Sequence, residues 1–180
     1  MKILGIDPGS IKTGYALIEI NGKSASIITS GFVDLRKEKD FFARLAGLHN
    51  FFLSFLKEHG SDFEVSIESL IHVKNVNSLA KLSQARGAIL SLLLAEGCQA
   101  YEYAPNLIKS SISGHGHASK DSLAKALGFL FPQHTFSSDD ESDALALALC
   151  HSLYRGSAKS PRKSAGKRGS LKDSLKHLEK

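Results

Sequence analysis

Two apolar runs joined by a turn of a few residues open the sequence, and they constrain the fold more than any other feature. Residues 2–7 and 13–20 have the length and β-branched content of strands, and Pro8 and Gly9 stand between them. Asn21-Gly22 is a strong hairpin signal, and residues 25–33 form a third strand pattern. The chain is therefore predicted to begin with an antiparallel meander, whose first strand ends in a carboxylate, Asp7.

Helical and strand patterns alternate through the rest of the sequence. Apolar spacing predicts helices at 40–58, at about 77–96 with Asn77 or Ser78 as its cap, at 119–129 and at 138–154. Shorter apolar runs predict strands at 63–68 and 100–103, and the polar stretch 105–118 is expected to be a helical turn followed by a loop. A meander followed by strand–helix–strand crossovers indicates an α/β domain with a mixed five-stranded sheet flanked by helices.

The positive charge of the chain is concentrated at its C-terminus. The net charge is +5 over 180 residues, whereas residues 155–180 alone carry nine Lys and Arg against two acids, so the rest is slightly acidic. We expect one folded domain at 1–155 and a basic, disordered tail at 156–180. Such a tail suits a phosphate backbone, although a purely solubilising role is equally compatible with its charge.

Nothing in the sequence points to secretion or to a membrane. We find no signal-peptide pattern after Met1 and no apolar stretch of spanning length. Cys98 and Cys150 each stand in an apolar context, which is typical of reduced core residues. These features predict a cytoplasmic protein.

Four acids occupy positions that a core-forming pattern would normally give to apolar residues. Asp7 and Glu68 each end a predicted strand, and Asp140 and Asp143 lie one helical turn apart at the start of the last, otherwise apolar helix. The face that carries these two continues through buried-type residues, so both are expected to point at the sheet; its further members are Ala144, Leu147 and His151.

Carboxylates directed at one place repel each other, and burial would raise their pKa values. A divalent cation removes this conflict, because Mg²⁺ and Mn²⁺ prefer oxygen ligands and a two-metal site can hold both oxygens of a phosphodiester displacement. Each acid also has a local explanation. A strand-end Asp is often a turn residue, and Asp139, Asp140 and Glu141 would be favoured by the helix dipole. The combination favours a metal site.

Three segments of the chain resemble, in order, the signature regions of the RuvC family of bacterial Holliday junction resolvases. They are KILGIDPGSIKTGYALIE, SIESLIHVKNVNSLAKLSQARGAI and DESDALALALCH, and the similarity covers about residues 2–154. The resemblance implies a ribonuclease H-like fold, a homodimer whose interface is the helix at about 77–96, and a bacterial cytoplasmic enzyme of DNA recombination and repair. It also implies RuvA and RuvB as partners.

The activity that the resemblance implies is hydrolysis of two opposed strands of a four-way DNA junction, with two Mg²⁺ ions per subunit and Mn²⁺ as an alternative. The implied catalytic and metal-binding tetrad is Asp7, Glu68, Asp140 and Asp143. Asp7 would bridge the two ions, and water on one ion would be the nucleophile. Lys109 and Lys120 match family lysines near the DNA backbone.

One position departs from the family pattern. The aromatic residue that is thought to stack at the junction centre in well-known members is replaced by Ile71, which is followed by His72. Stacking on a base needs a flat side chain. We therefore expect DNA contact either from Ile71 as an apolar wedge or from His72 by stacking.

The sequence fits two other function classes less well than a resolvase and leaves a third open. An actin-like kinase or ATPase would need a second lobe, for which 180 residues leave no room. A non-catalytic DNA-junction-binding module would leave converging acids without a cation, which is destabilising. A related ribonuclease H-like nuclease acting on another substrate, such as RNA, remains an alternative.

Overall fold

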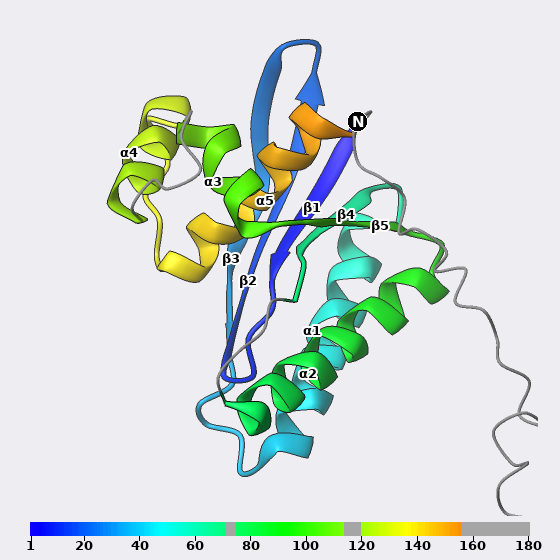
Figure 1. Ribbon diagram of the computed structural model, residues 1–180. Coiled ribbons are helices and arrows are strands. Elements are labelled where there is room, and N and C mark those ends of the chain that lie inside the picture. The colour runs from blue at the N-terminus through cyan, green and yellow to red at the C-terminus, as the bar shows by residue number, and fades with distance from the viewer. Residues whose placement is uncertain (71–74, 114–119, 156–180) are drawn as a thin grey trace, which may run out of the picture.

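The computed structural model describes residues 1–70, 75–113 and 120–155 (Figure 1). Its elements follow the predicted order, and residues 105–113 form a full helix in place of the single turn expected there. They are β1 (Lys2–Asp7), β2 (Lys12–Asn21), β3 (Ser24–Asp34), α1 (Phe41–His59), β4 (Glu64–Glu68), α2 (Val76–Ala95), β5 (Gln99–Tyr103), α3 (Pro105–Ser113), α4 (Lys120–Leu130) and α5 (Asp139–Tyr154).

The five strands form one mixed sheet in the order β3-β2-β1-β4-β5. The first three pair antiparallel, and β4 pairs parallel with both β1 and β5. Gly22 adopts φ +63° at the tip of the β2–β3 hairpin, a left-handed conformation that glycine accepts without strain. The predicted meander and the α/β class are both confirmed.

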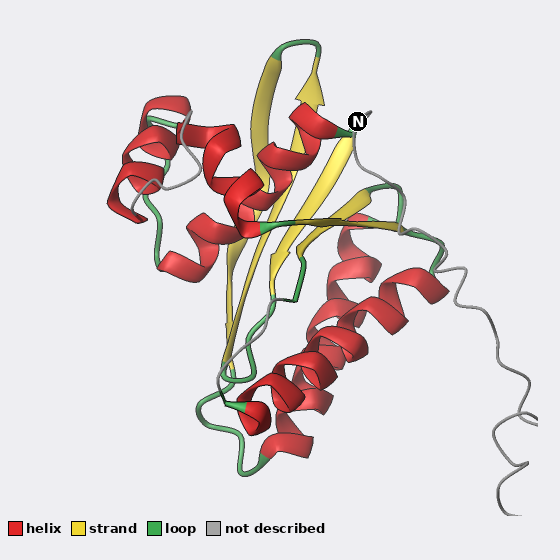
Figure 2. Cartoon of the chain, viewed as in Figure 1, coloured by secondary structure: helices red, strands yellow, loops and turns green. Residues whose placement is uncertain are grey.

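Helices cover both faces of the sheet (Figure 2). Strand alternation divides the core, so that Ile3 and Ala16 pack with α5 while Leu4 and Leu17 pack with α1 and α2. Helix α5 lies directly on the sheet, and every residue from Ala144 to His151 is buried. Within the described part of the chain, no helix combines the length and apolar character needed to cross a membrane.

The helix caps differ from expectation at one point. The side chain of Asp40 caps α1 and that of Ser138 caps α5. For α2 the cap is Asn75, whose side-chain oxygen accepts hydrogen bonds from the backbone N–H groups of Asn77 and Ser78. The residues predicted to cap α2 are therefore the ones that receive the cap, because an N-cap oxygen binds N–H groups two and three positions ahead of it.

Candidate active site at the edge of the sheet

Asp7 is the last residue of β1 and is held there by a tight turn into β2. It pairs with Gly14 across the antiparallel ladder. Inside the turn, the Gly9 N–H donates to Thr13 Oγ1 at 3.2 Å and the Thr13 hydroxyl donates back to the Gly9 carbonyl at 3.1 Å. A Cβ at Gly9 would stand 1.9 Å from the Lys12 oxygen, so only glycine fits this turn.

Glu68 ends the strand next to Asp7 and lies at the same edge of the sheet. Strands β1 and β4 are parallel, and Ile6 is in register with Ile67, so Asp7 and Glu68 come one residue later on each. Both side chains are half-buried. Because side chains alternate along a strand, Glu68 shares the face of Ser66, whose hydroxyl donates to the Leu147 carbonyl of α5 at 2.7 Å. Glu68 therefore faces α5.

The register of α5 against β4 predicts that Asp143 lies near Glu68. At the other end of this pair, His151 Nε2 lies 2.6 Å from Glu64 Oε2. Four helical residues advance about 6 Å and two strand residues about 6.6 Å, so every fourth residue of α5 is level with every second residue of β4. His151 contacts Glu64 and Leu147 contacts Ser66, so continuing the same steps predicts residue 143 beside residue 68.

The first turn of α5 is brought to Asp7 by a close approach to β2. An ideal Cβ at Gly14 would be 1.9 Å from the backbone oxygen of Asp140, so the helix packs directly against the strand backbone there. Gly14 is the residue that pairs with Asp7. Gly5 gives the same close approach further along, against the oxygen of Ala144. Two glycines therefore set the distance between α5 and the strands that carry the acids.

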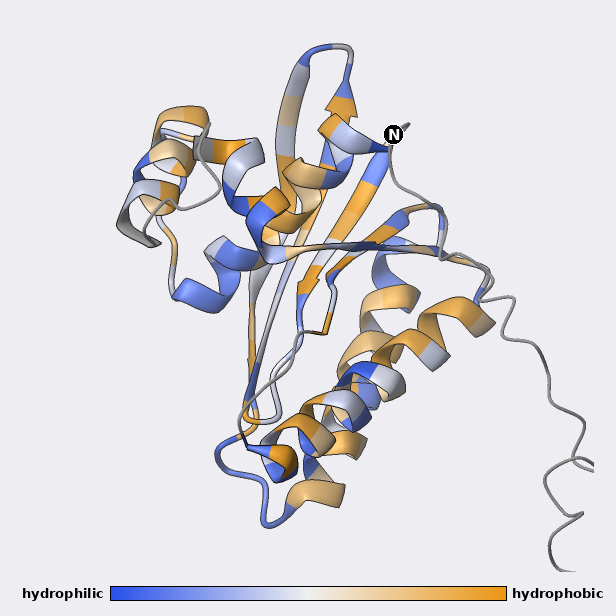
Figure 3. Cartoon of the chain, in the orientation of Figure 1, coloured by the Kyte–Doolittle hydropathy of each residue, from blue (hydrophilic) through white to orange (hydrophobic). Residues whose placement is uncertain are grey.

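The N-terminus of α5 suits carboxylates. Asp139, Asp140 and Glu141 occupy its first turn, which Figure 3 shows as hydrophilic against the largely apolar helix behind it. Unsatisfied N–H groups and the helix dipole favour negative charge at this end. Asp140 and Asp143 are half-buried and Asp139 is exposed. That Asp140, and not its neighbour, belongs to the site stays a prediction.

Glu141 was not predicted as a site residue, yet it is buried to 2% exposure beside the two aspartates. Burial raises the pKa of its carboxyl, but hydrogen bonds from Ser137, Ser30 and His134 outweigh that effect and leave the pKa lowered. The sequence carried a signal for it, because Ser138-Asp139-Asp140-Glu141 matches the capping-box pattern of Ser followed three residues later by Glu.

At the far end of α5, His151 is fully buried between Tyr103 and Glu64. Burial lowers the pKa of His151, and burial also raises the pKa of Tyr103 to about 12. A neutral imidazole therefore accepts from the Tyr103 hydroxyl at Nδ1, over 2.6 Å, and donates to Glu64 from Nε2. Arg155 adds a second contact to Glu64, so this end of α5 is fixed to the sheet.

The chemistry of the donor set at the acidic edge fits a hard divalent cation, since all four side chains are carboxylates. The fit concerns the elements and the faces they present. Among the residues that the structure describes, no group of three or more His, Cys, Asp or Glu side chains is gathered closely enough to hold a metal ion. What relates Asp7, Glu68, Asp140 and Asp143 is the placement of their elements and the strand register, and their role as a ligand tetrad stays a prediction.

The expected DNA contacts are only partly visible. Lys109 is half-buried on α3, a helix whose Ile108 belongs to the same core cluster as α5. Lys120 begins α4, but its side chain lies outside the described residues, as do Ile71 and His72. DNA contact by Ile71 or His72 thus remains a prediction.

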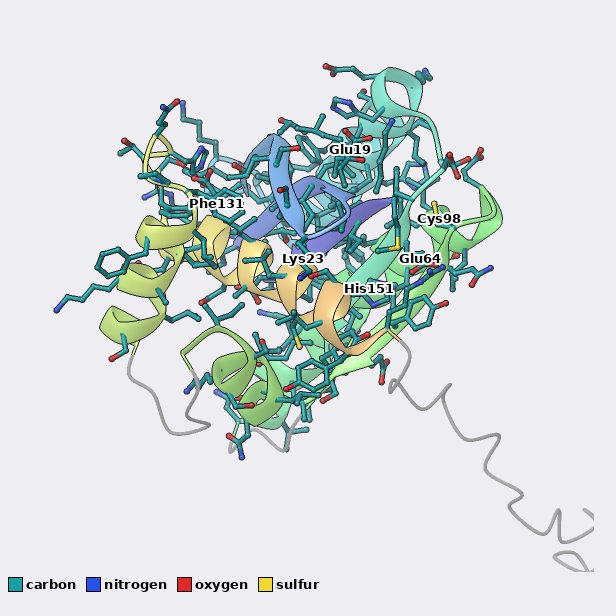
Figure 4. All side chains as sticks on the ribbon, turned by 90° about the horizontal axis from the view of Figure 1, so that it is seen from above. Glu19, Lys23, Glu64, Cys98, Phe131 and His151 are labelled. Atoms are coloured by element: carbon teal, nitrogen blue, oxygen red, sulfur yellow. The ribbon has the colours of Figure 1, made fainter. Side chains whose placement is uncertain are left out.

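A cavity of about 730 Å³ lies away from the acids, between the β2–β3 hairpin and the helices on that face. Lys23 and Phe131, both labelled in Figure 4, line it. None of the four acids does.

Comparisons with known proteins find relatives that match most of the chain. The family model described as "Crossover junction endodeoxyribonuclease RuvC" matches residues 3–151. A protein of that name from Rhizobium etli is 36% identical over 87% of this chain and 92% of its own length. Another, from Allorhizobium ampelinum, is 37% identical over 92% of this chain and 98% of its own length.

Solved structures show the same fold. T. thermophilus RuvC, described in complex with Holliday junction substrate, superimposes with a TM-score of 0.81 at 27% identity, covering 88% of this chain and 98% of its own. The yeast mitochondrial Holliday junction resolvase Ydc2 superimposes with a TM-score of 0.59 at 14% identity over 86% of this chain and 83% of its own, which supports the fold alone.

Proposed function

The chain belongs to the RuvC family of crossover junction endodeoxyribonucleases, and we propose that it resolves Holliday junctions by hydrolysing opposed strands. The reaction centre we propose is the acidic edge of the sheet, with four carboxylates as ligands of Mg²⁺ or Mn²⁺: Asp7, Glu68, Asp140 and Asp143.

The observation that carries this proposal is the convergence of three elements on one edge. β1 ends at Asp7 and β4 at Glu68, while α5 begins above them in a register fixed by Ser66 and by Gly14. A structural role for the acids would not require all of them to share that edge and face. A cation site requires both.

Each part of the chain has a separate task in the proposed reaction. Bound divalent cations would supply an activated water and stabilise charge on the leaving oxygen. The rigid 8–12 turn and the glycine contacts hold the carboxylates in place, so that little reorganisation is needed when a phosphodiester arrives.

DNA binding is assigned to positively charged residues outside the acidic edge of the sheet. We assign 1–155 to the nuclease domain and 156–180 to a basic arm that contacts phosphates, with Lys109 and Lys120 as backbone contacts nearer the site. Phosphate contacts of this kind fix position without reading sequence, which suits an enzyme selected by the branched shape of its substrate.

A homodimer completes the proposal. A two-fold dimer offers two sites to the two opposed strands of a two-fold junction. Helix α2 supports this assignment, because Val76 is 74% exposed and Leu94 51% exposed on a helix whose Ala85, Ile89 and Leu93 are already buried in the core. These two residues are 18 positions, or five helical turns, apart, so they lie on the same side of α2, the side on which we propose that the partner packs.

Single substitutions of the acids test the proposal. Asp7→Asn and Asp143→Asn should abolish junction cleavage in Mg²⁺ while leaving junction binding intact, since binding depends on phosphate contacts. Asp139→Asn is the matched control, because Asp139 is an exposed acid in the same helical turn as Asp140. Near wild-type cleavage by Asp7→Asn would contradict the metal-site assignment.

A further inference from the structure

The first turn of α5 is fastened by Glu141, a residue with no assigned part in the chemistry. Its Oε1 accepts a hydrogen bond from the Ser30 hydroxyl at 2.6 Å and lies 2.9 Å from His134 Nε2. Its Oε2 accepts from the Ser137 N–H at 2.7 Å and from the Ser137 hydroxyl at 2.6 Å. A single carboxylate thereby joins α5 to β3 and to the segment that precedes the helix.

This carboxylate is an unusual choice for a purely structural contact. Glu141 is only 2% exposed, and burying a charged group is costly unless all its oxygens are hydrogen-bonded. Apolar residues of similar volume often replace buried polar networks without loss of stability. What they do not reproduce is direction, because several hydrogen bonds of defined geometry fix the helix in both rotation and translation.

Rotation of α5 is what the proposed metal site tolerates least. Glu141 lies between Asp140 and Asp143 in sequence and points to β3, so its bonds oppose any turning of the acidic end of the helix. A side chain about 5–6 Å from the helix axis moves by about 1 Å when the helix turns by about 10°. Functional groups need to be held within about 0.5 Å of their working geometry.

We propose that Glu141 is a positioning residue that holds Asp140 and Asp143 in the orientation needed for divalent cations, through its contacts with Ser30, His134 and Ser137. This inference rests on the proposed function of the same site. Glu141 itself does not coordinate the cation, since its oxygens are occupied by Ser30, His134 and Ser137.

A matched control exists at the other end of the same helix. Glu64 is also a carboxylate that fastens α5, through His151 and Arg155, and Figure 4 labels Glu64 and His151 there. His151 lies about two helical turns after Asp143. Removing either glutamate loosens α5 from the rest of the protein. Only Glu141 is adjacent to the proposed ligands, so only its loss should affect metal binding selectively.

The test compares Glu141→Ala, Glu141→Gln and Glu64→Ala in the full-length protein. Two midpoints are measured in Mg²⁺ or Mn²⁺. The first is the metal concentration that gives half of the Tm rise reached at the highest concentration tested, without DNA. The second is the metal concentration that gives half-maximal junction cleavage. Loss of a residue that orients metal ligands typically costs about 10–100-fold in metal affinity, so Glu141→Ala should raise both midpoints by at least about tenfold. Glu141→Gln, which keeps one acceptor oxygen, should recover part of the loss, and Glu64→Ala should stay within about twofold of wild type.

Ser30→Ala keeps the test decisive where Glu141→Ala does not fold. It removes one hydrogen bond to Glu141 and should shift the midpoints in the same direction by a smaller factor. Equal midpoints for the Glu141 and Glu64 variants, or a wild-type midpoint in every foldable Glu141 and Ser30 variant, would overturn the positioning role alone. A wild-type protein that responds to neither metal would refute the metal site and the positioning role with it.

Discussion

A methyl group added at Gly14 should separate the acids without changing any of them. An ideal Cβ there would stand 1.9 Å from the Asp140 oxygen and 2.4 Å from its carbonyl carbon, whereas real Cβ atoms essentially never approach closer than 3.0 Å. Both neighbours are backbone, so no side-chain rotation relieves the clash. In Gly14→Ala the first turn of α5 must therefore retreat from β2 by about 1 Å.

The retreat has a kinetic and a thermodynamic consequence. A misplacement of about 1 Å at a catalytic group can cost about 10²-fold in rate, so the cleavage rate of bound junction should fall by about that factor. Overpacking of this kind costs about 1–3 kcal/mol in the free energy of unfolding. Junction affinity should change little, because the phosphate contacts lie outside the displaced turn.

Single-turnover cleavage of a saturated junction, well below the Tm of each variant, separates these effects. Gly128→Ala is the control, since a Cβ at that exposed helical position meets nothing within 4 Å. It should cleave at the wild-type rate and gain slightly in stability, as Gly-to-Ala changes in helices do. A Gly14→Ala protein that is folded and cleaves at the wild-type rate would refute the argument that this contact sets the site.

Two further outcomes are expected. Burial lowers the pKa of His151 from 6.5, so below that pH the unfolded chain takes up a proton that the folded protein does not. The free energy of unfolding should therefore fall as the pH drops below about 6.5. Denaturant titrations at pH 7.5 and 5.5 should show this fall, and it should be smaller in His151→Asn. Deleting 156–180 should weaken junction binding and flatten its salt dependence while leaving the cleavage rate of the bound complex unchanged, whereas an unaltered salt slope would show that the tail is not a DNA arm.

Periodicity explains why the positions of the acids could be predicted from the sequence. The alternation of β4 places Glu68 on the face of Ser66, and the helical period places Asp143 one turn before Leu147, so two local rules fix which faces meet. Pro8 and Gly9 end the first strand directly after Asp7, which places Asp7 at the edge of the sheet. The fold class followed from the same periodicities and from the hairpin signal.

What the sequence could not supply were partners distant along the chain. Ser30 lies 111 positions before Glu141, and Glu64 lies 87 positions before His151, so no local pattern links either pair. The predicted helical turn at 105–118 was too short for a different reason, because the polar composition of α3 resembles that of a loop, while Ile108 is buried against the core. Tertiary packing selects the helix there.

Cleavage of a synthetic four-way junction in Mg²⁺, beside linear duplex and single strand of the same sequence, tests the central claim most directly. The account predicts paired nicks at symmetric positions in opposed strands of the junction, and intact duplex and single strand. Equal cleavage of all three substrates would contradict junction specificity. Junction that is bound but uncut in both Mg²⁺ and Mn²⁺ would contradict the catalytic role of the acidic edge.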